Sequence, residues 1–318
     1  MKILITGGTG FLGSNLAKKL LEKNPSCELV IPTTDIRQQN SFKSLNLDLK
    51  RIHLVNGDIR DYDFIRLLFN EYEFTGVFHL AAISEVRKCQ DDAKLAFDVN
   101  IGGVINVLEV CRLFSENIKF IIMSSSDKAY GSGELPYKED TKLDGKSIYE
   151  VSKSSADLVA RSYFYNFNLP VVVTRCSNLY GPGDMNFSRV IPNNINKILK
   201  EENPIIWKGS EKAIREYLYI SDAVNAYVDI SEKINKTMGK AYNIGSGVKL
   251  NVEELINMLL IQMKSDLKIE YLEKNFPEIQ NQYLDSSLIS EDIGWQPQIS
   301  IEQGLNESID FYRKFFTK

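Results

Sequence analysis

Short apolar runs alternate with amphipathic segments through the first half of the chain. Uninterrupted apolar runs are typical of strands buried on both faces of a parallel sheet, whereas apolar residues at every third or fourth position predict helices. The predicted strands cover residues 2–6, 28–34, 51–55, 76–80, 119–124 and 170–175, and the predicted helices cover 14–23, 63–71, 93–114 and 148–165. This alternation indicates an α/β fold with a doubly wound parallel sheet, whose ligands bind along the edge where the strands end.

The pattern changes after residue 176, where proline and glycine separate shorter elements. We expect strands at 215–220 and 240–244 and helices at 222–233, 252–263 and 301–316, the first of these helices with its N-cap near Ser221. We therefore divide the chain into a large domain of residues 1–176, to which segments near 215–245 return, and a smaller α/β lobe of residues 177–214 and 246–318.

Composition and charge exclude several classes of function. Of the 318 residues, 43% are hydrophobic and 25% are charged, which is ordinary for a globular protein. The net charge of −4 argues against broad attraction to nucleic acid or to a membrane surface. No apolar run reaches the ~18 residues of a membrane span, and the N-terminus leads directly into a glycine loop, so we expect a cytoplasmic protein without a signal peptide.

The cysteines and histidines do not indicate a metal site. The four cysteines are scattered, and neither they nor the two histidines show the spacing of metal ligands. We therefore expect reduced thiols, most of them buried, and no bound metal.

A glycine loop follows the first predicted strand. Gly7, Gly10 and Gly13 lie between this strand and a helix that we expect to begin at Ser14. Such glycines permit a tight turn and let the backbone approach a pyrophosphate, which the helix N-terminus also attracts. The loop indicates a dinucleotide cofactor.

The choice between NAD and NADP depends on where the second strand ends. If that position falls on Asp35, its carboxylate would hold the ribose diol of NAD. If it falls on Thr33, Arg37 would meet a 2′-phosphate and favour NADP. We expect NAD. Asp58 either accepts a hydrogen bond from the adenine amino group or caps the following helix.

Two residues on one predicted helix suggest a catalytic base. Tyr149 and Lys153 are four residues apart and therefore share a helix face. A neighbouring ammonium favours the phenolate and so lowers the pKa of a phenol. Tyr149 is thus a candidate base for a substrate hydroxyl, and Ser126, at a strand end, would hydrogen-bond the same hydroxyl.

Ten short motifs carry a family resemblance. They are TGGTGFLG at 6–13, GDIRD at 57–61, HLAA at 79–82, DVNIG at 98–102, SSSDKAYG at 124–131, YEVSK at 149–153, RCSNLYGP at 175–182, REYLYISD at 215–222, NIGSG at 243–247 and GWQP at 294–297. Over nearly its whole length the chain resembles the extended short-chain dehydrogenases/reductases that modify nucleotide sugars. The resemblance implies a Rossmann domain that binds the dinucleotide and a smaller lobe that binds a nucleotide-diphosphate sugar.

The resemblance also implies roles for particular residues. Tyr149 would be the base, Lys153 would bind the nicotinamide ribose and lower the pKa of Tyr149, and Asn100 would support the active-site strand. Ala81 and Ala82 would line the cofactor near its phosphates. Further cofactor contacts are expected from Phe11, Leu12, Ile59, Leu80, Ser124 and Cys176. Substrate contacts are expected from Ser84, Glu85, Ser126, Asn178, Arg189 and Arg215, although the two arginines would also fit surface ion pairs.

The helices at 93–114 and 148–165 resemble the pair that builds a four-helix dimer interface in this family. A homodimer is therefore expected.

Asp127 and Lys128 decide between reactions. Dehydratases that resemble the dTDP-glucose enzyme carry an Asp–Glu pair here, whereas the pair Asp127–Lys128 resembles CDP-glucose 4,6-dehydratases and inverting UDP-N-acetylglucosamine dehydratases. We therefore expect a 4,6-dehydratase that gives a 4-keto-6-deoxy sugar. If the pair is only a structural turn or ion pair, the enzyme would be a C4 dehydrogenase or epimerase. A non-catalytic dinucleotide-binding regulator is the third hypothesis.

Overall fold

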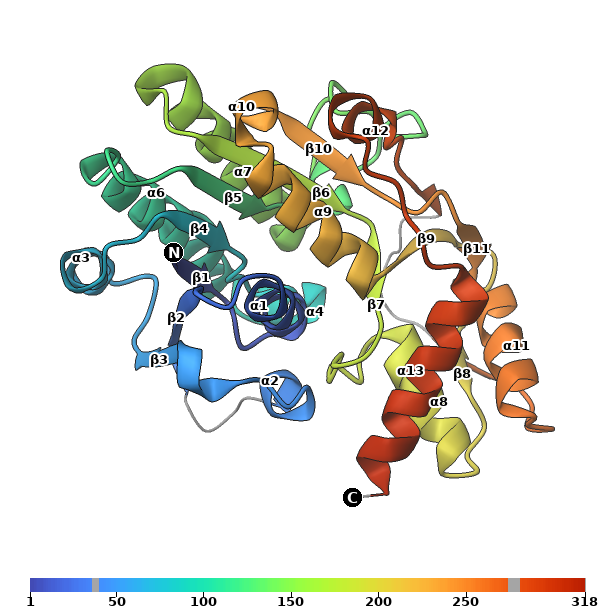
Figure 1. The fold of residues 1–318 in the computed structure, drawn as a ribbon. Coiled ribbons are helices and arrows are strands. Elements are labelled where there is room, and N and C mark those ends of the chain that lie inside the picture. The colour runs from blue at the N-terminus through green and yellow to red at the C-terminus, as the bar shows by residue number, and fades with distance from the viewer. Residues whose placement is uncertain (36–39, 274–280, 318) are drawn as a thin grey trace.

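A computed structural model describes residues 1–35, 40–273 and 281–317 (Figure 1). Seven parallel strands form the large sheet, in the order β10-β6-β5-β4-β1-β2-β3. They are β1 (Lys2–Thr6), β2 (Glu28–Thr33), β3 (Ile52–Asn56), β4 (Gly76–His79), β5 (Phe120–Ser124), β6 (Val171–Cys176) and β10 (Ala241–Ile244). The predicted parallel sheet is confirmed, with a seventh strand at its edge.

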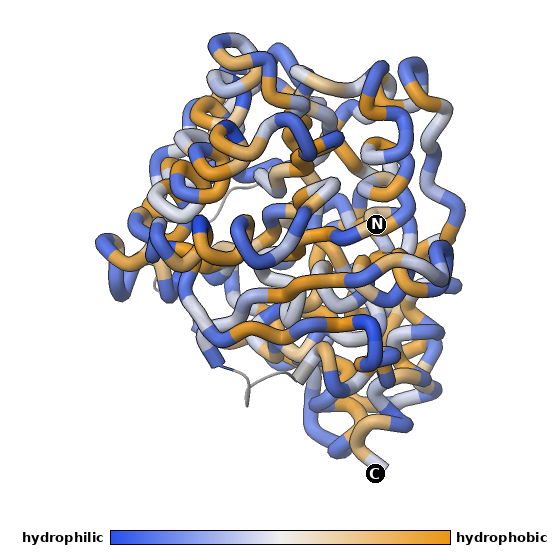
Figure 2. Tube along the Cα trace, turned by 60° about the vertical axis from the view of Figure 1, so that its left-hand side comes forward, coloured by the Kyte–Doolittle hydropathy of each residue, from blue (hydrophilic) through white to orange (hydrophobic). Residues whose placement is uncertain are grey.

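Helices cover both faces of this sheet. One face packs against α1 (Phe11–Lys23) and α9 (Ile220–Glu232), and the other against α3 (Tyr62–Glu71), α6 (Gly103–Leu113) and α7 (Ile148–Phe167). Within β1, Ile3 and Ile5 point into the first layer and Leu4 into the second, all fully buried. Since both faces are covered, most residues of the central strands are apolar, and Figure 2 shows the strands mostly in the hydrophobic colour.

The remaining helices are short or belong to the C-terminal half. They are α2 (Asn40–Ser44), α4 (Val86–Asp91), α5 (Ala93–Phe97), α8 (Val190–Leu199), α10 (Ile234–Thr237), α11 (Val252–Met263), α12 (Ser287–Ile293) and α13 (Ile301–Phe316). Two short 3₁₀ turns are η1 (Leu49–Arg51) and η3 (Asp127–Tyr130), and η3 directly follows the end of β5.

Three predicted helices differ in detail from the structure. α1 begins at Phe11, earlier than expected, because Gly10 occupies the N-cap position in an extended conformation. The helix predicted at 93–114 is α5 and α6 joined by a π-helical turn, Asp98–Gly102. α9 begins at Ile220, with Tyr219 as its N-cap, so the strand before it passes directly into the helix and Ser221 caps nothing.

A smaller sheet lies near the C-terminal half of the chain. Its central strand, β9 (Ile214–Tyr219), pairs with β7 (Asn178–Tyr180), β11 (Lys249–Asn251) and β13 (Asn281–Gln282). β8 (Ile205–Trp207) pairs separately with β12 (Glu270–Leu272). β10 returns to the large sheet, as expected of the 215–245 segment, whereas β9 stays in the small one. The residue boundaries of the two domains remain a proposal.

The cysteines agree with the prediction, because all four are free and buried. Within the described ranges, no helix combines the length and the apolar character that crossing a bilayer requires.

A buried carboxylate connects three segments in the smaller part of the molecule, by which we mean the smaller sheet of β7, β9, β11 and β13, the β8–β12 pair and the helices packed on them. Glu216 in β9 is fully buried and accepts hydrogen bonds from the backbone N–H groups of Gly247 at 2.7 Å and Leu284 at 2.9 Å. These contacts fasten β9 to the loop after β10 and to the chain after β13. Burial nevertheless dominates and raises the pKa of Glu216 to about 7.

Glu216 therefore makes stability depend on pH in a defined direction. The folded protein retains the Glu216 proton up to about pH 7, whereas the unfolded chain releases it near 4.5, so the free energy of unfolding falls as pH rises between these values. This part of the fall is about 3 kcal/mol. We expect Glu216→Gln to flatten the dependence by that amount.

Urea denaturation at several pH values from 4.5 to 7.5 measures the difference between the two proteins. The other buried acids contribute equally to both. Parallel pH curves for the wild type and the Gln variant would contradict the assignment.

Candidate active site

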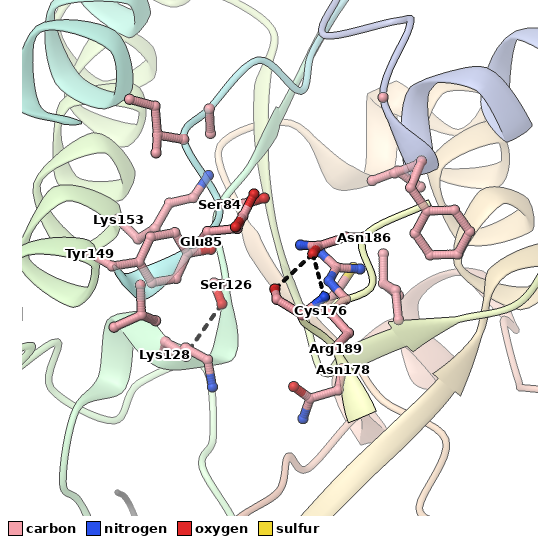
Figure 3. Close-up of a pocket in the computed structure, with 18 of the residues that line it drawn as sticks. Ser84, Glu85, Ser126, Lys128, Tyr149, Lys153, Cys176, Asn178, Asn186 and Arg189 are labelled. Carbon is pink, nitrogen blue, oxygen red and sulfur yellow. Dashed lines mark hydrogen bonds between the residues drawn. The ribbon is translucent and has the colours of Figure 1, made fainter. Parts of the chain in front are cut away.

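A cleft of about 1390 Å³ lies between the large sheet and the smaller part of the molecule. It follows the ends of β1, β4 and β5, where a doubly wound sheet binds its ligands. Pockets for one small ligand measure roughly 300–1,000 Å³, so this cleft has room for more than one. Figure 3 shows Tyr149, Lys153, Ser126 and Lys128 on one wall, with Asn178 and Arg189 on the other.

The glycine loop has the shape that a pyrophosphate requires. Gly7 adopts a φ of +69°, and a Cβ there would lie 2.6 Å from the backbone nitrogen of Ala81. A side chain is therefore excluded at this position. The N-terminus of α1 receives no hydrogen bond from a capping side chain, which leaves its first N–H groups for an anion. These features fit a dinucleotide.

Asp58 lies in the cleft and not at a helix N-cap. Its carboxylate accepts hydrogen bonds from the backbone N–H of Arg60 at 2.9 Å and from the Arg60 guanidinium. These bonds hold the pKa of Asp58 below its usual value. The cap of α3 is Asp61, which accepts from the N–H of Phe64 at 3.0 Å. The capping alternative for Asp58 is therefore wrong.

The end of β2 does not by itself identify the cofactor. The strand ends at Thr33, which lines the cleft, whereas Asp35 follows two residues later and is not among the lining residues. Thr33, and not Asp35, thus stands at the strand end where a residue would meet the ribose of the cofactor. Arg37, which would meet a 2′-phosphate, lies outside the described residues.

Tyr149 and Lys153 come from the first turns of α7. A capping box of Ser147 and Glu150 starts this helix, with each side chain bonded to the backbone of the other residue. Both Tyr149 and Lys153 line the cleft and are more than nine-tenths buried. The Lys153 ammonium donates a hydrogen bond to the carbonyl oxygen of Ser124, at the end of β5, at 2.8 Å.

Burial opposes the predicted activation of the phenol. It raises the pKa of Tyr149 to about 12, although a hydrogen bond with Ser126 and the charge of Arg189 act in the other direction. Burial likewise lowers the pKa of Lys153 to about 8. The predicted lowering of the phenol pKa is thus wrong for the protein side chains alone. The charge of an oxidised nicotinamide would act in the direction that the phenolate needs.

Asp127 and Lys128 form the turn η3 beside this pair, and both line the cleft. Asp127 is 2% exposed, and one carboxylate oxygen accepts from the Ser126 hydroxyl at 2.9 Å. Among the described residues, its other oxygen, Oδ2, has no partner. Burial raises the pKa of Asp127 and so favours the protonated acid. Lys128 donates from Nζ to Oε1 of Gln282 at 3.0 Å.

Asn100 lies behind the cleft and does not line it. Its amide nitrogen donates to the Ser152 hydroxyl at 2.9 Å, and its amide oxygen accepts from the N–H of Ile83 at 2.8 Å. Asn100 therefore joins the loop after β4 to α7. Asn100 was expected to support the active-site strand, but its hydrogen bonds fix this loop and this helix instead.

The two arginines lie in the cleft on the side of the smaller part. Arg189 pairs with the buried carboxylate of Asp184 at 3.3 Å, and its guanidinium lies 5.9 Å from the centre of the Phe11 ring. Arg215 is 8% exposed and donates to the Ile214 carbonyl at 2.9 Å. The ion pair expected for Arg189 thus exists, but inside the cleft.

The cleft brings together most of the predicted site residues. They are Gly7, Gly10, Phe11, Leu12, Gly13, Asp58, Ile59, Leu80, Ala81, Ala82, Ser84, Glu85, Ser124, Ser126, Asp127, Lys128, Tyr149, Lys153, Cys176, Asn178, Arg189 and Arg215. Sequence reasoning missed Trp207 in β8, which also lines the cleft. A half-exposed tryptophan at the end of an apolar run, one of only two in the chain, was the available signal.

Comparison with known proteins identifies the family. Residues 4–308 match the family model described as GDP-mannose 4,6 dehydratase. The chain therefore belongs to this family of NAD-dependent nucleotide-sugar dehydratases and epimerases, a group of extended short-chain dehydrogenases/reductases.

The relatives include both dehydratases and epimerases. A CDP-paratose 2-epimerase from Salmonella typhi is 29% identical, over 98% of this chain and 99% of its own. A dTDP-glucose 4,6-dehydratase structure from Streptomyces venezuelae, with NAD bound, has a TM-score of 0.89 and 27% sequence identity. The match covers 99% of this chain and 97% of that one. A UDP-glucuronic acid 4-epimerase structure from Bacillus cereus, with UDP-glucuronic acid and NAD, has a TM-score of 0.87 and 28% sequence identity. This match covers 99% of this chain and 100% of that one.

Removing the Tyr149 hydroxyl tests the catalytic assignment. We expect Tyr149→Phe to reduce turnover at least ~10²-fold, the usual contribution of a general base, because no other phenol on α7 lines the described cleft. NAD affinity, measured by titration calorimetry, should stay within a few fold, since the ring and the glycine loop remain. Turnover near that of the wild type would exclude Tyr149 as the base.

Proposed function

Starting from membership of this family, we propose that the protein is a nucleotide-sugar 4,6-dehydratase that produces a 4-keto-6-deoxy sugar. The observation that carries the proposal is the buried carboxyl of Asp127 next to Ser126 and Tyr149. Water loss needs an acid that still holds its proton near neutral pH, and burial raises the pKa of Asp127 in that direction. Its other oxygen, Oδ2, is buried and has no hydrogen-bond partner among the described residues, so a substrate hydroxyl would supply the partner that the protein does not.

Different residues act at C4, C5 and C6 of the sugar. Tyr149 takes the proton of the C4 hydroxyl, which Ser126 orients, while Lys153 keeps a positive charge near the phenol. The glycine loop would hold NAD, which would supply the acceptor for the C4 hydride and the donor of that hydride to C6. Lys128 takes the proton from C5, and Asp127 gives its proton to the C6 hydroxyl, which leaves as water. Lys128 then returns a proton to C5 once the hydride has reached C6, which gives the 4-keto-6-deoxy sugar. The pair Asp127–Lys128 supports a relation to CDP-glucose 4,6-dehydratases.

The second candidate is a C4 epimerase or dehydrogenase that keeps the C6 oxygen. The Bacillus cereus relative with UDP-glucuronic acid supports it, and so does the Tyr149–Ser126 pair, which serves C4 oxidation in either reaction. Under this alternative, Asp127 and Lys128 would only shape the turn. Family membership argues against the third hypothesis, a non-catalytic regulator.

We infer that the substrate is a nucleotide-diphosphate sugar. Arg189 and Arg215 offer guanidinium groups on the wall of the cleft that faces the catalytic residues, and a guanidinium suits phosphate oxygens. Trp207 lines the same region with an indole ring that a nucleobase would stack on.

A homodimer through α6 and α7 is part of the proposal. These helices pack side by side and carry large apolar side chains at the surface, including Ile105, Leu158 and Tyr165. Leu158 and Tyr165 are seven residues apart on α7 and so face the same way, with exposed fractions of 54% and 70%. A second copy would cover this surface.

Replacing Asp127 by Asn distinguishes the two reactions. We expect Asp127→Asn to stop water loss and to spare C4 oxidation, because the amide keeps the shape of the side chain but has no acidic proton. Mass spectrometry of the product measures water loss, and hydride transfer from C4-deuterated substrate measures the oxidation. Unchanged water loss would remove Asp127 from the acid role. If the wild type releases no water from any nucleotide sugar that it oxidises, the epimerase or dehydrogenase reading replaces the proposal.

A charged residue at the proposed interface tests the dimer. We expect Leu158→Glu to convert a dimer into a monomer in size-exclusion chromatography with light scattering, since burying a carboxylate at an apolar interface is unfavourable. Leu67→Glu is the matched control, because Leu67 on α3 is 61% exposed and lies outside α6 and α7. A monomeric wild type, or a Leu158→Glu dimer, would exclude this interface.

A further inference from the structure

Lys128 is held in the cleft by a residue from the smaller part of the molecule. Its ammonium donates to Oε1 of Gln282 at 3.0 Å, a contact between residues 154 positions apart. Gln282 ends β13 and is not among the residues that line the cleft. Gln282 therefore acts on a bound substrate only through residues that line the cleft, and its side chain hydrogen-bonds one of them, Lys128.

The strand that carries Gln282 is fixed by its neighbours. In β13, Gln282 lies opposite Arg215 of β9. The N–H of Leu284 donates to the buried Glu216 carboxylate at 2.9 Å, and the carbonyl of Tyr283 accepts from the N–H of Tyr137 at 3.1 Å. The Gln282 side chain is itself fully buried. A side chain with so little freedom determines where the ammonium lies.

Packing alone does not explain a glutamine at this position. The amide nitrogen of Gln282 is buried and has no hydrogen-bond partner among the described residues. A buried donor without an acceptor is unfavourable, so an apolar side chain of the same length would suit the interior better. Within the described ranges, the one side-chain hydrogen bond that Gln282 forms is the one with Lys128.

The partner of Lys128 is uncharged, and this has a chemical consequence. In the part of the chain that the structure describes, no carboxylate lies within ion-pair distance of the Lys128 ammonium. A carboxylate in place of the amide would favour the charged form of the lysine. An amide oxygen instead fixes the nitrogen without adding a charge beside it.

We propose that Gln282 is a positioning residue that holds Lys128 beside Asp127 through a neutral acceptor, so that the lysine can take a proton from the substrate. The identity of that proton, the one on C5, rests on the proposed dehydratase function. The placement of Lys128 by Gln282 does not.

Two variants of the full-length protein separate placement from charge. Gln282→Met keeps the length of the side chain and removes both the acceptor and the unpartnered donor, so it should fold with unchanged or higher stability. Gln282→Glu keeps an acceptor oxygen and adds a charge. Chemical denaturation of both variants first establishes that they are folded.

The first measurement needs no turnover. Acetic anhydride labels neutral amines, and peptide mass spectrometry gives the rate for each lysine, with exposed Lys18 as the internal standard. At neutral pH, Lys128 should react at least ~10-fold more slowly in Gln282→Glu, because an opposite charge nearby favours the ammonium by an order of magnitude or more. It should react faster than the wild type in Gln282→Met, where nothing holds the amine. Equal labelling of Lys128 in all three proteins would overturn the proposal.

The second measurement follows the reaction. Exchange of the C5 hydrogen in D₂O should slow at least ~10-fold in both variants, the scale of a displaced general base, while C4 oxidation stays near the wild-type rate. Raising the pH should restore the exchange in Gln282→Glu but not in Gln282→Met. If C4 oxidation and C5 exchange fall together, the role is only structural and the proposal is wrong. If the wild type keeps the C6 oxygen yet the labelling rates differ as expected, the dehydratase function fails and the placement of Lys128 stands.

Discussion

The buried guanidinium of Arg175 is the contact on which the geometry of the cleft depends. From β6, it donates to both carboxylate oxygens of Asp157 in α7, at 2.7 and 2.9 Å, and to the hydroxyl of Tyr130 in η3 at 2.7 Å. One side chain thus joins the helix that carries the phenol and ammonium to the turn that carries the acid. Apolar residues could match such an ion pair in stability, but loss of one partner leaves a charge in the interior at a cost of about 3–5 kcal/mol. The pair therefore fixes how α7 and η3 lie relative to each other.

The same constraint reaches the smaller part of the molecule. The Tyr130 hydroxyl bonds to the side chain of Asn243 in β10, whose amide nitrogen donates to the carbonyl oxygens of Tyr137 and Asp285. Asp285 follows β13 by three residues, in the segment that also supplies the acceptor for Lys128. The catalytic turn is thus attached to both parts of the chain. A nucleotide sugar bound by the smaller part would meet catalytic groups whose distance from that part is already set.

The sequence predicts those features of the fold and the site that depend on residues close together in the chain. The apolar run of β1 is buried on alternate sides, and the glycine at residue 7 has a positive φ and no room for a side chain, so both leave a signature in the sequence. Contacts between distant segments leave none. The bond between Lys128 and Gln282 joins residues 154 positions apart, and Trp207 enters the cleft only because β8 lies beside it. The phenol pKa was predicted from its neighbour four residues away, whereas burial by the whole fold has the larger effect.

Burial raises the pKa of both proton-transfer groups, with opposite consequences for their proposed roles. It raises the pKa of Asp127, which favours the protonated form that water loss needs, and it raises the pKa of Tyr149, which hinders a base. A cation beside the phenol therefore has to offset the burial of Tyr149, whereas Asp127 needs no such help. C4 epimerisation needs the phenol but no such acid. If the enzyme only epimerised, the unfavourable burial of an Asp127 oxygen that has no partner among the described residues would have no functional explanation. A protonated acid serves a reaction in which an oxygen leaves, and this difference is why we propose dehydration instead of simple inversion at C4.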